Sequence, residues 1–195
     1  MKLDEGVTLM NDAMQRHRRG NEGFTLLEVL VAVLVLSIGL LGIAGLQVTG
    51  LRFNHSAYMR TQATLLAYEL ADRMRANRPT MVANGYDPIA TGGIGGVSVP
   101  ACETAAGCAT AQMAQNDVFQ WQQRLAQVLP NGQGVVCLDA IADPPGTPLS
   151  STPAAPSCNP PVAPAPAPYA IKVWWDDNRT GDPATFQRFV VTLTP

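Results

Sequence analysis

The chain has 195 residues, which is room for one small domain and an additional segment, because domains usually have roughly 100 to 150 residues. Its 13 basic and 15 acidic residues give a net charge of −2, so a broad basic surface for a nucleic-acid backbone is not expected. Hydrophobic residues make up 47% of the chain and charged residues only 14%, and the apolar residues are concentrated in one early stretch, which indicates a membrane segment.

Residues 1–23 are mostly polar, and a cluster of basic side chains between positions 16 and 19 lies just before the apolar stretch. By the positive-inside rule, this end of the chain is expected in the cytoplasm. Residues 29–51 carry no formal charge, and this run is longer than the roughly 20 residues that a helix needs to cross a bilayer. We therefore predict one membrane-spanning helix over residues 24–51.

An acidic residue, Glu28, lies at the start of the apolar stretch, where a charge is costly in lipid and suggests a function. It is the fifth residue after Gly23, in the string Gly-Phe-Thr-Leu-Leu-Glu. This string resembles the cleavage and methylation motif of type IV prepilins. The resemblance implies that a prepilin peptidase cuts after Gly23, that the new N-terminal Phe24 is N-methylated and that the apolar helix packs into a filament core.

The resemblance also gives Glu28 a partner. A carboxylate buried among packed helices needs a cation, and the free amine of Phe24 in a neighbouring subunit can supply one. Such a pair would set the register between subunits and makes Glu28 a subunit-assembly residue. The alternatives are an ordinary secretory signal and a plain signal anchor, but neither explains the string around Gly23.

Three glycines, Gly39, Gly42 and Gly45, punctuate the apolar stretch, and each weakens a helix by roughly 1 kcal/mol relative to alanine. In membranes, small residues let helices approach closely. In filaments of the resembled family, this part of the helix can lose its regular structure. We therefore interpret the three glycines as assembly features that give the helix flexibility.

Residues 52–78 are expected to continue the helix as an amphipathic segment that packs on a head domain. Apolar residues recur there at helical spacing, at Leu66, Leu70 and Met74. The helix should end near Asn77, because Pro79 disfavours helical geometry in the residue before it.

Residues 79–195 are expected to form a globular head, in the oxidising periplasm. Asp117 is expected to cap a short helix that ends at the turn Pro130-Asn131-Gly132. The glycine-rich stretch 91–96 reads as a loop. One face of the predicted helix carries an apolar stripe of Val118, Trp121, Leu125, Val128 and Leu129.

Residues 134–138 predict a strand, and 170–175 and 188–193 predict two more that should pair as an antiparallel hairpin. Between the first and second of these strands, residues 143–168 contain 10 prolines in 26 positions and are expected to form an extended excursion. Two sets of alternating side chains should cover the long helix: Ile171, Val173 and Trp175, and Phe189, Val191 and Leu193. The fold class is therefore α+β: a long N-terminal helix packed on a small antiparallel sheet, with irregular loops rich in proline and glycine.

The four cysteines, an even number, suit two disulfides in an oxidising compartment. Three pairings are possible. The short flexible loops favour Cys102 with Cys108 and Cys137 with Cys158. Because no Cys-x-x-Cys occurs and the chain has only two histidines, neither a metal site nor a cofactor is expected.

The turn before the last strand has a second interpretation. Oxygen-bearing side chains alternate around Gly181 as in the first half of a calcium loop. However, Gln187 stands where such a loop needs an acid, and strands instead of helices flank the turn. A hairpin turn is therefore the favoured interpretation, and calcium is the alternative. The residues concerned are Asp176, Asn178, Thr180 and Asp182.

Three further strings, at residues 36–47, 129–132 and 173–176, resemble minor pilins of the PilV kind, the type IV pilus modification proteins. The resemblance implies a low-abundance subunit that primes pilus assembly at or near the filament tip. Its implied partners are a prepilin peptidase, other minor pilins, the major pilin, a tip adhesin and inner-membrane lipid. The chain would cross the inner membrane once with its head in the periplasm, and would later lie in the pilus on the cell surface.

Two alternatives share this N-terminus. One is a minor pseudopilin of a type II secretion system. The other is a DNA-uptake minor pilin, although Arg124 is the only Lys or Arg between residues 90 and 168, and no nucleic acid is expected as a partner. An enzyme is not expected, because the head contains no histidine base and no nucleophile motif.

Overall fold

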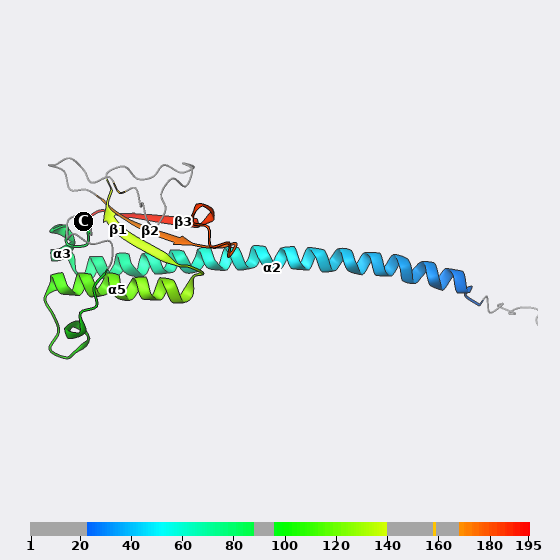
Figure 1. Ribbon diagram of the computed structural model, residues 1–195, viewed down its shortest axis with the longest axis horizontal. Coiled ribbons are helices and arrows are strands. Elements are labelled where there is room, and N and C mark those ends of the chain that lie inside the picture. The colour runs from blue at the N-terminus through cyan, green and yellow to red at the C-terminus, as the bar shows by residue number, and fades with distance from the viewer. Residues whose placement is uncertain (1–22, 88–95, 140–157, 159–167) are drawn as a thin grey trace, which may run out of the picture. The chain divides into compact units, whose positions relative to one another are not determined.

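The computed structural model describes residues 23–87, 96–139, 158 and 168–195 (Figure 1). The leader up to position 22, the glycine-rich stretch 91–95 and nearly all of the proline-rich excursion lie outside the described residues. Met1–Gly50 and Leu51–Pro195 are two separate compact units. The elements are α2 (Leu26–Ala76), α3 (Arg78–Val82), the 3-10 turn η1 (Pro100–Glu103), α5 (Thr110–Val128), β1 (Gln133–Leu138), β2 (Tyr169–Trp175), the 3-10 turn η2 (Pro183–Thr185) and β3 (Gln187–Leu193).

The predicted long helix is α2, which runs unbroken from Leu26 to Ala76. Thr25 caps its start, because the Thr25 hydroxyl accepts a hydrogen bond from the Glu28 backbone N–H at 3.2 Å. The helix ends next to Asn77, as predicted. A short helix that the sequence analysis did not predict, α3, follows at once, since a proline such as Pro79 is tolerated in the first turn of a new helix.

The second long helix, α5, corrects one prediction. It begins at Thr110, so Asp117 lies in its middle and is not its cap. The side chain of Gln112 serves the N-terminus instead, by accepting from the Ala109 backbone N–H at 3.2 Å. The predicted stripe is buried except for Val128, which is 39% exposed.

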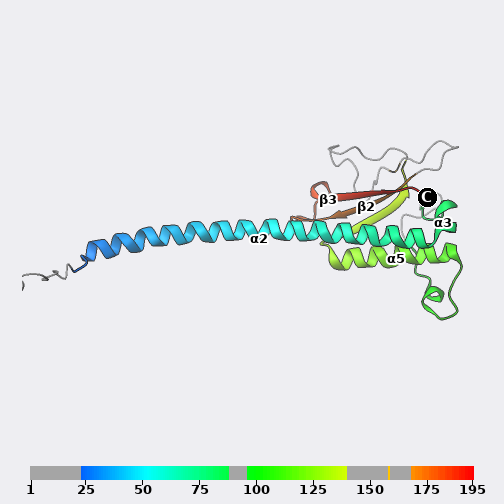
Figure 2. The ribbon, with the colours of Figure 1, turned by 180° about the vertical axis from the view of Figure 1, so that it is seen from behind.

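The three strands form one antiparallel sheet in the order β1-β2-β3. The predicted hairpin is confirmed as β2 paired with β3, with Val173 opposite Phe189. One face of β2, with Ile171, Val173 and Trp175, joins the main core together with residues of α2 and α5. The C-terminal part of α2 packs against both the sheet and α5, so the α+β fold class is confirmed (Figures 1 and 2). α5 also contacts β1, where the Gln122 amide donates to the Gly134 carbonyl at 2.9 Å.

A stripe of small residues on α2 allows this close packing. Ala63, Ala67 and Ala71 repeat every four residues and are completely buried. With only a methyl group at each position, neighbouring elements approach the helix backbone closely. The Trp121 indole N–H accordingly reaches the Leu66 carbonyl oxygen at 2.9 Å. The whole buried stripe of α2 is Met59, Ala63, Leu66, Ala67, Leu70, Ala71 and Met74.

Polar side chains also join α2 to α5. Asp117 accepts from the Arg73 guanidinium at 3.2 Å and from the Tyr86 hydroxyl at 3.1 Å. Asn77 donates to the Thr110 carbonyl at 2.7 Å. Burial raises the pKa of Tyr86, and the neighbouring Asp117 charge adds to the increase. Asp117 therefore acts as a link between helices.

The other face of β2 is buried as well. Trp174 packs there in a second cluster with Val135, Cys137 and Phe186. The Lys172 Nζ lies 2.8 Å from the Asp139 Oδ2, and both side chains are fully buried. Each charge offsets part of the cost of burying the other, so removing one partner would leave an uncompensated buried charge.

The turn between β2 and β3 is organised by Asp176. The Asp176 carboxylate accepts from the backbone N–H groups of Thr180 at 3.1 Å and Gly181 at 2.7 Å, and from the Asn131 amide at 3.3 Å. Gly181 adopts a φ of 73°, a conformation that favours glycine. Burial raises the pKa of Asp176, but these hydrogen bonds lower it more, so the pKa lies below its ordinary value.

Replacing Asp176 with asparagine should destabilise the head and reduce its sensitivity to acid. Because the folded-state pKa lies below the unfolded value of about 3.9, the ionised carboxylate stabilises the head above about pH 4. This stabilisation is lost as the pH falls through the folded-state pKa. Thermal unfolding followed by tryptophan fluorescence should therefore show a smaller loss of stability between about pH 7 and about pH 3 in Asp176→Asn than in the wild type.

The matched control is Asp72→Asn, because the Asp72 side chain is exposed on α2. It should behave like the wild type at both pH values. Equal acid sensitivity in Asp176→Asn and the wild type would contradict the role given to the Asp176 carboxylate.

Candidate functional site

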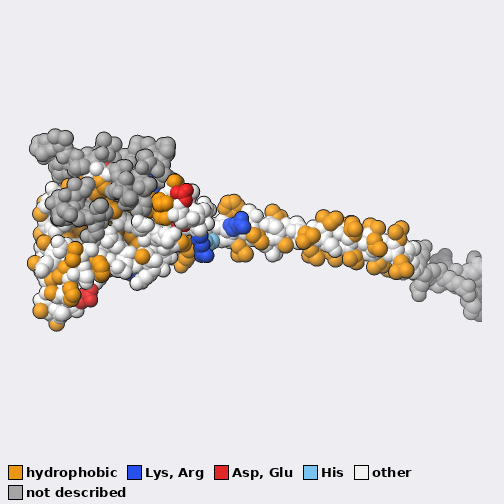
Figure 3. All heavy atoms as spheres, viewed as in Figure 1, with side chains coloured by type: hydrophobic (Ala, Val, Ile, Leu, Met, Phe, Trp, Pro, Cys, Tyr) orange, Lys and Arg blue, Asp and Glu red, His pale blue; other side chains and the backbone are white. Residues whose placement is uncertain are grey.

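The candidate functional site is the N-terminal part of α2, where apolar side chains are exposed on every side. All residues from Gly23 to Leu51 are exposed within the chain. Of the helices that the structure describes, α2 is the one long and apolar enough to cross a membrane. Figure 3 shows hydrophobic side chains along the whole of this segment. Such a surface is unfavourable in water, at about 25 cal/mol per Å², so it requires lipid or other helices.

The predicted cleavage residues lie directly before the helix. Gly23, Phe24 and Thr25 precede the first helical residue, and Phe24 is 81% exposed. The bond between Gly23 and Phe24 is thus outside regular secondary structure, where a peptidase can reach it. A cut there would place a new amine close to the N-terminus of α2.

Glu28 lies in the first turn of α2. A carboxylate at this position offsets the positive end of the helix dipole, and it would also offset the charge of an amine at Phe24. Within the part of the chain that the structure describes, the Glu28 carboxylate makes no ion pair. The assembly role of Glu28 stays a prediction.

The three glycines of the apolar segment have no role inside the single chain. A Cβ atom at Gly39, Gly42 or Gly45 would contact nothing within 4 Å, and α2 continues through all three as a regular helix. Neither a turn nor internal packing therefore accounts for them. Among the described residues, nothing requires glycine at these three positions, and their role in assembly stays a prediction.

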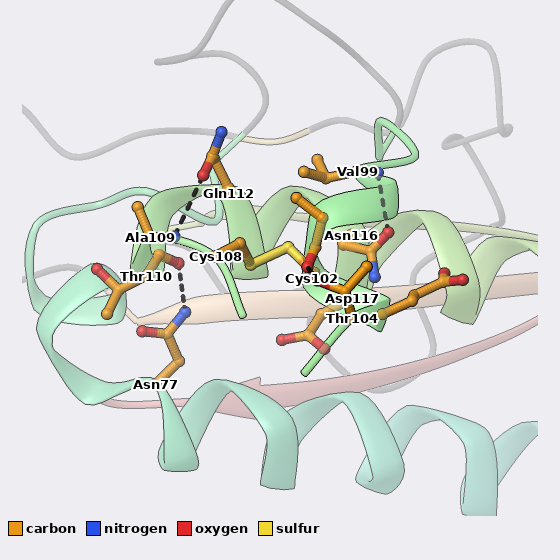
Figure 4. Close-up of a disulfide and its surroundings, with 12 residues drawn as sticks. Asn77, Val99, Cys102, Thr104, Cys108, Ala109, Thr110, Gln112, Asn116 and Asp117 are labelled. Carbon is orange, nitrogen blue, oxygen red and sulfur yellow. Dashed lines mark hydrogen bonds between the residues drawn. A yellow bond between two sulfur atoms is a disulfide. The ribbon is translucent and has the colours of Figure 1, made fainter. Parts of the chain in front are cut away.

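The structure forms two disulfides, Cys102–Cys108 and Cys137–Cys158, which is the pairing favoured by the loop lengths. Figure 4 shows the first one in the loop before α5. This loop is fixed to α5 by a hydrogen bond from the Val99 backbone N–H to the Asn116 side chain at 3.0 Å. The second disulfide joins Cys137 of β1 to Cys158.

In the turn between β2 and β3, the carboxylate oxygens that could bind calcium already accept hydrogen bonds. Both Asp176 carboxylate oxygens face N–H donors, and Asp182 Oδ1 accepts from the Ala184 backbone N–H at 2.9 Å. Among the described residues, no group of three or more His, Cys, Asp or Glu side chains could hold a metal ion. The turn is built as a hairpin connection.

The sequence analysis missed two features near these sites. Thr25 was not recognised as a cap, although a threonine followed three residues later by a glutamate is a known helix-start signal. The buried pair of Lys172 and Asp139 gave no local signal in the sequence, because its two members are far apart along the chain.

Comparison with protein families gives two adjacent matches. The model described as the prokaryotic N-terminal methylation motif matches residues 18–44. The model described as Type IV pilin Tt1218 matches residues 45–119. No curated protein and no solved structure matches the chain. The two matches together run from the methylation motif through α2 and into α5, and the chain belongs to the type IV pilin-like family.

Proposed function

We propose that the protein is a minor type IV pilin that helps to prime pilus assembly and lies at or near the filament tip. The observation that carries its role as a subunit is the exposed apolar half of α2, whose one charge, Glu28, lies within the matched N-terminal methylation motif. Among the residues that the structure describes, nothing covers this surface. A membrane first, and packed helices of other subunits later, would satisfy it.

The assignment as a minor pilin is supported by a contact within the head. Two of the strings that resemble type IV pilus modification proteins of the PilV kind are far apart in the sequence but meet in the fold. The Asp176 backbone N–H donates to the Pro130 carbonyl at 2.9 Å, and the Asn131 amide reaches the Asp176 carboxylate. The two strings are therefore parts of one structural unit.

The proposed sequence of events starts in the inner membrane, with the head in the periplasm. Prepilin peptidase cuts after Gly23 and Phe24 is methylated. The Phe24 amine of one subunit then pairs with Glu28 of its neighbour, while Gly39, Gly42 and Gly45 let the helices pack closely or loosen. Other minor pilins, the major pilin and a tip adhesin are the partners.

A minor pseudopilin of a type II secretion system is the closest alternative, because it would share the same N-terminal chemistry. A DNA-uptake role has less support. Arg73, Arg75 and Arg124 are each paired with a carboxylate, and Lys172 is buried. The carboxylate partners of these arginines would compete with the binding of a phosphate backbone.

Processing is the first test. In cells that contain prepilin peptidase, mass spectrometry of the purified protein should find a chain that begins at N-methylated Phe24. An intact Met1, or a cut after Ala44 as in a secretory signal, would exclude processing as a prepilin.

Replacing Glu28 with alanine should leave processing largely intact but impair incorporation into pili. The variant would leave a buried Phe24 amine without its counter-charge, which costs about 3 to 5 kcal/mol and should reduce incorporation at least about tenfold. Quantitative immunoblots of sheared pili measure this. Asp72→Ala, on the exposed face of α2, is the control and should incorporate normally; normal incorporation of Glu28→Ala would contradict the proposed ion pair.

A priming role predicts a large effect from few copies. Deleting the gene should remove most surface pili while the major pilin stays in the membrane, and immunogold labelling should find the protein at one filament end. Uniform labelling would contradict a tip position. Normal piliation with lost protein secretion would favour the pseudopilin alternative.

A further inference from the structure

Directly after the apolar segment, α2 carries a group of exposed basic and aromatic side chains. We call this group the collar. Phe53 is 72% exposed and Tyr58 is 55% exposed, and the basic residues beside them are exposed as well. Figure 3 shows basic side chains where the apolar segment ends. The collar consists of Arg52, Phe53, His55, Tyr58 and Arg60.

We propose that the collar binds the phosphate groups of the outer leaflet of the inner membrane and so fixes the depth of the unassembled subunit. The proposal rests on the membrane anchoring proposed above. It names the residues and the lipid chemistry that would set the position of the anchor.

The first argument is the absence of a counter-charge. From Val29 to Tyr68, α2 contains no Asp or Glu. Within the described residues, neither Arg52 nor Arg60 makes an ion pair. In contrast, Arg73, Arg75 and Arg124 of the head all have carboxylate partners. The collar is therefore the site on α2 where an external anion would be bound.

The second argument is distance along the helix. The uncharged run ends at Leu51, and the headgroup layer beyond the hydrocarbon is about 5 to 8 Å thick. Arg52 and Phe53 follow at once. Arg60 is about 12 Å farther along than Arg52, but helical side chains tilt toward the N-terminus, so a long arginine side chain extends back toward the membrane.

The third argument is a groove on one face of this segment. Its volume is about 470 Å³, and its lining repeats at helical spacing. The Thr61 and Thr64 hydroxyls donate to carbonyl groups of their own helix, at 2.9 and 2.8 Å. These two hydroxyls are thus already used as donors. Among the lining residues that the structure describes, Arg60 is the one with a positive charge that could bind a phosphate, and the apolar ring of Phe53 precedes it on the side of the apolar segment. The lining residues are Phe53, Ser56, Ala57, Arg60, Thr61 and Thr64.

Aromatic side chains beside arginines are typical of a membrane–water interface, because each has an apolar body for the acyl boundary and a polar part for the headgroups. The first buried residue of α2, Met59, lies between Tyr58 and Arg60 of the collar. Lipid contacts there would keep the start of the head out of the hydrocarbon, and they would have to be broken when the subunit leaves the membrane.

The test uses the full chain in vesicles of equal parts phosphatidylethanolamine and phosphatidylglycerol, in a buffer without phosphate. Solid-state NMR measures dipolar coupling between ¹³C at arginine Cζ and lipid ³¹P. The double variant Arg52→Gln with Arg60→Gln should lose a distinct part of the coupled signal. The basic leader contributes equally to all variants, so the difference isolates the collar.

The matched control removes two exposed arginines of the head, Arg75→Gln near the end of α2 and Arg78→Gln at the start of α3. Arg75 is about 35 Å from Arg52 along α2. The control should keep the full coupled signal. Equal signals in the wild type and both double variants would overturn the proposal. Unchanged coupling combined with a specific loss of pilus incorporation in the collar variant would assign the arginines to subunit contacts and would also overturn it.

The vesicle measurement needs no other pilus protein. It can therefore succeed or fail independently of the proposed role in priming, which the deletion experiment tests.

Discussion

The head depends on the close packing of one helix stripe. Because Ala63, Ala67 and Ala71 present only methyl groups, the sheet and α5 both come close to the α2 backbone. The hydrogen bond from the Trp121 indole to the Leu66 carbonyl requires this proximity. A larger side chain on the stripe would separate the layers and would leave a buried indole N–H without its acceptor, which is costly.

The same helix has opposite requirements in its two halves. Residues of the C-terminal half are sorted into buried and exposed faces, whereas every residue of the apolar half is exposed. A surface of this kind is stable only in lipid or among other helices. The exposed apolar half of α2 is therefore the physical basis of the proposal that the protein is a subunit that moves from a membrane into a filament.

Much of the fold could be predicted from the sequence, because the signals are local. The helical spacing of apolar residues predicted α2, and the alternation of apolar and polar residues predicted the β2–β3 hairpin. The role of Asp117 could not be predicted, since its partners Arg73 and Tyr86 are more than 30 positions away. At the candidate site, the string around Gly23 predicts the cleavage and methylation residues. The contacts that neighbouring subunits would make with Glu28 and the apolar helix cannot be predicted from the sequence of one chain.

The central strand β2 is buried at all seven positions, which is unusual for a strand in a small antiparallel sheet. Trp174 and Trp175 face different cores on its two sides. The sheet therefore offers little of its central surface to a partner. Surface residues of helices and loops can diversify between related subunits without disturbing the strand pairing, so binding specificity and foldability can evolve separately in this head.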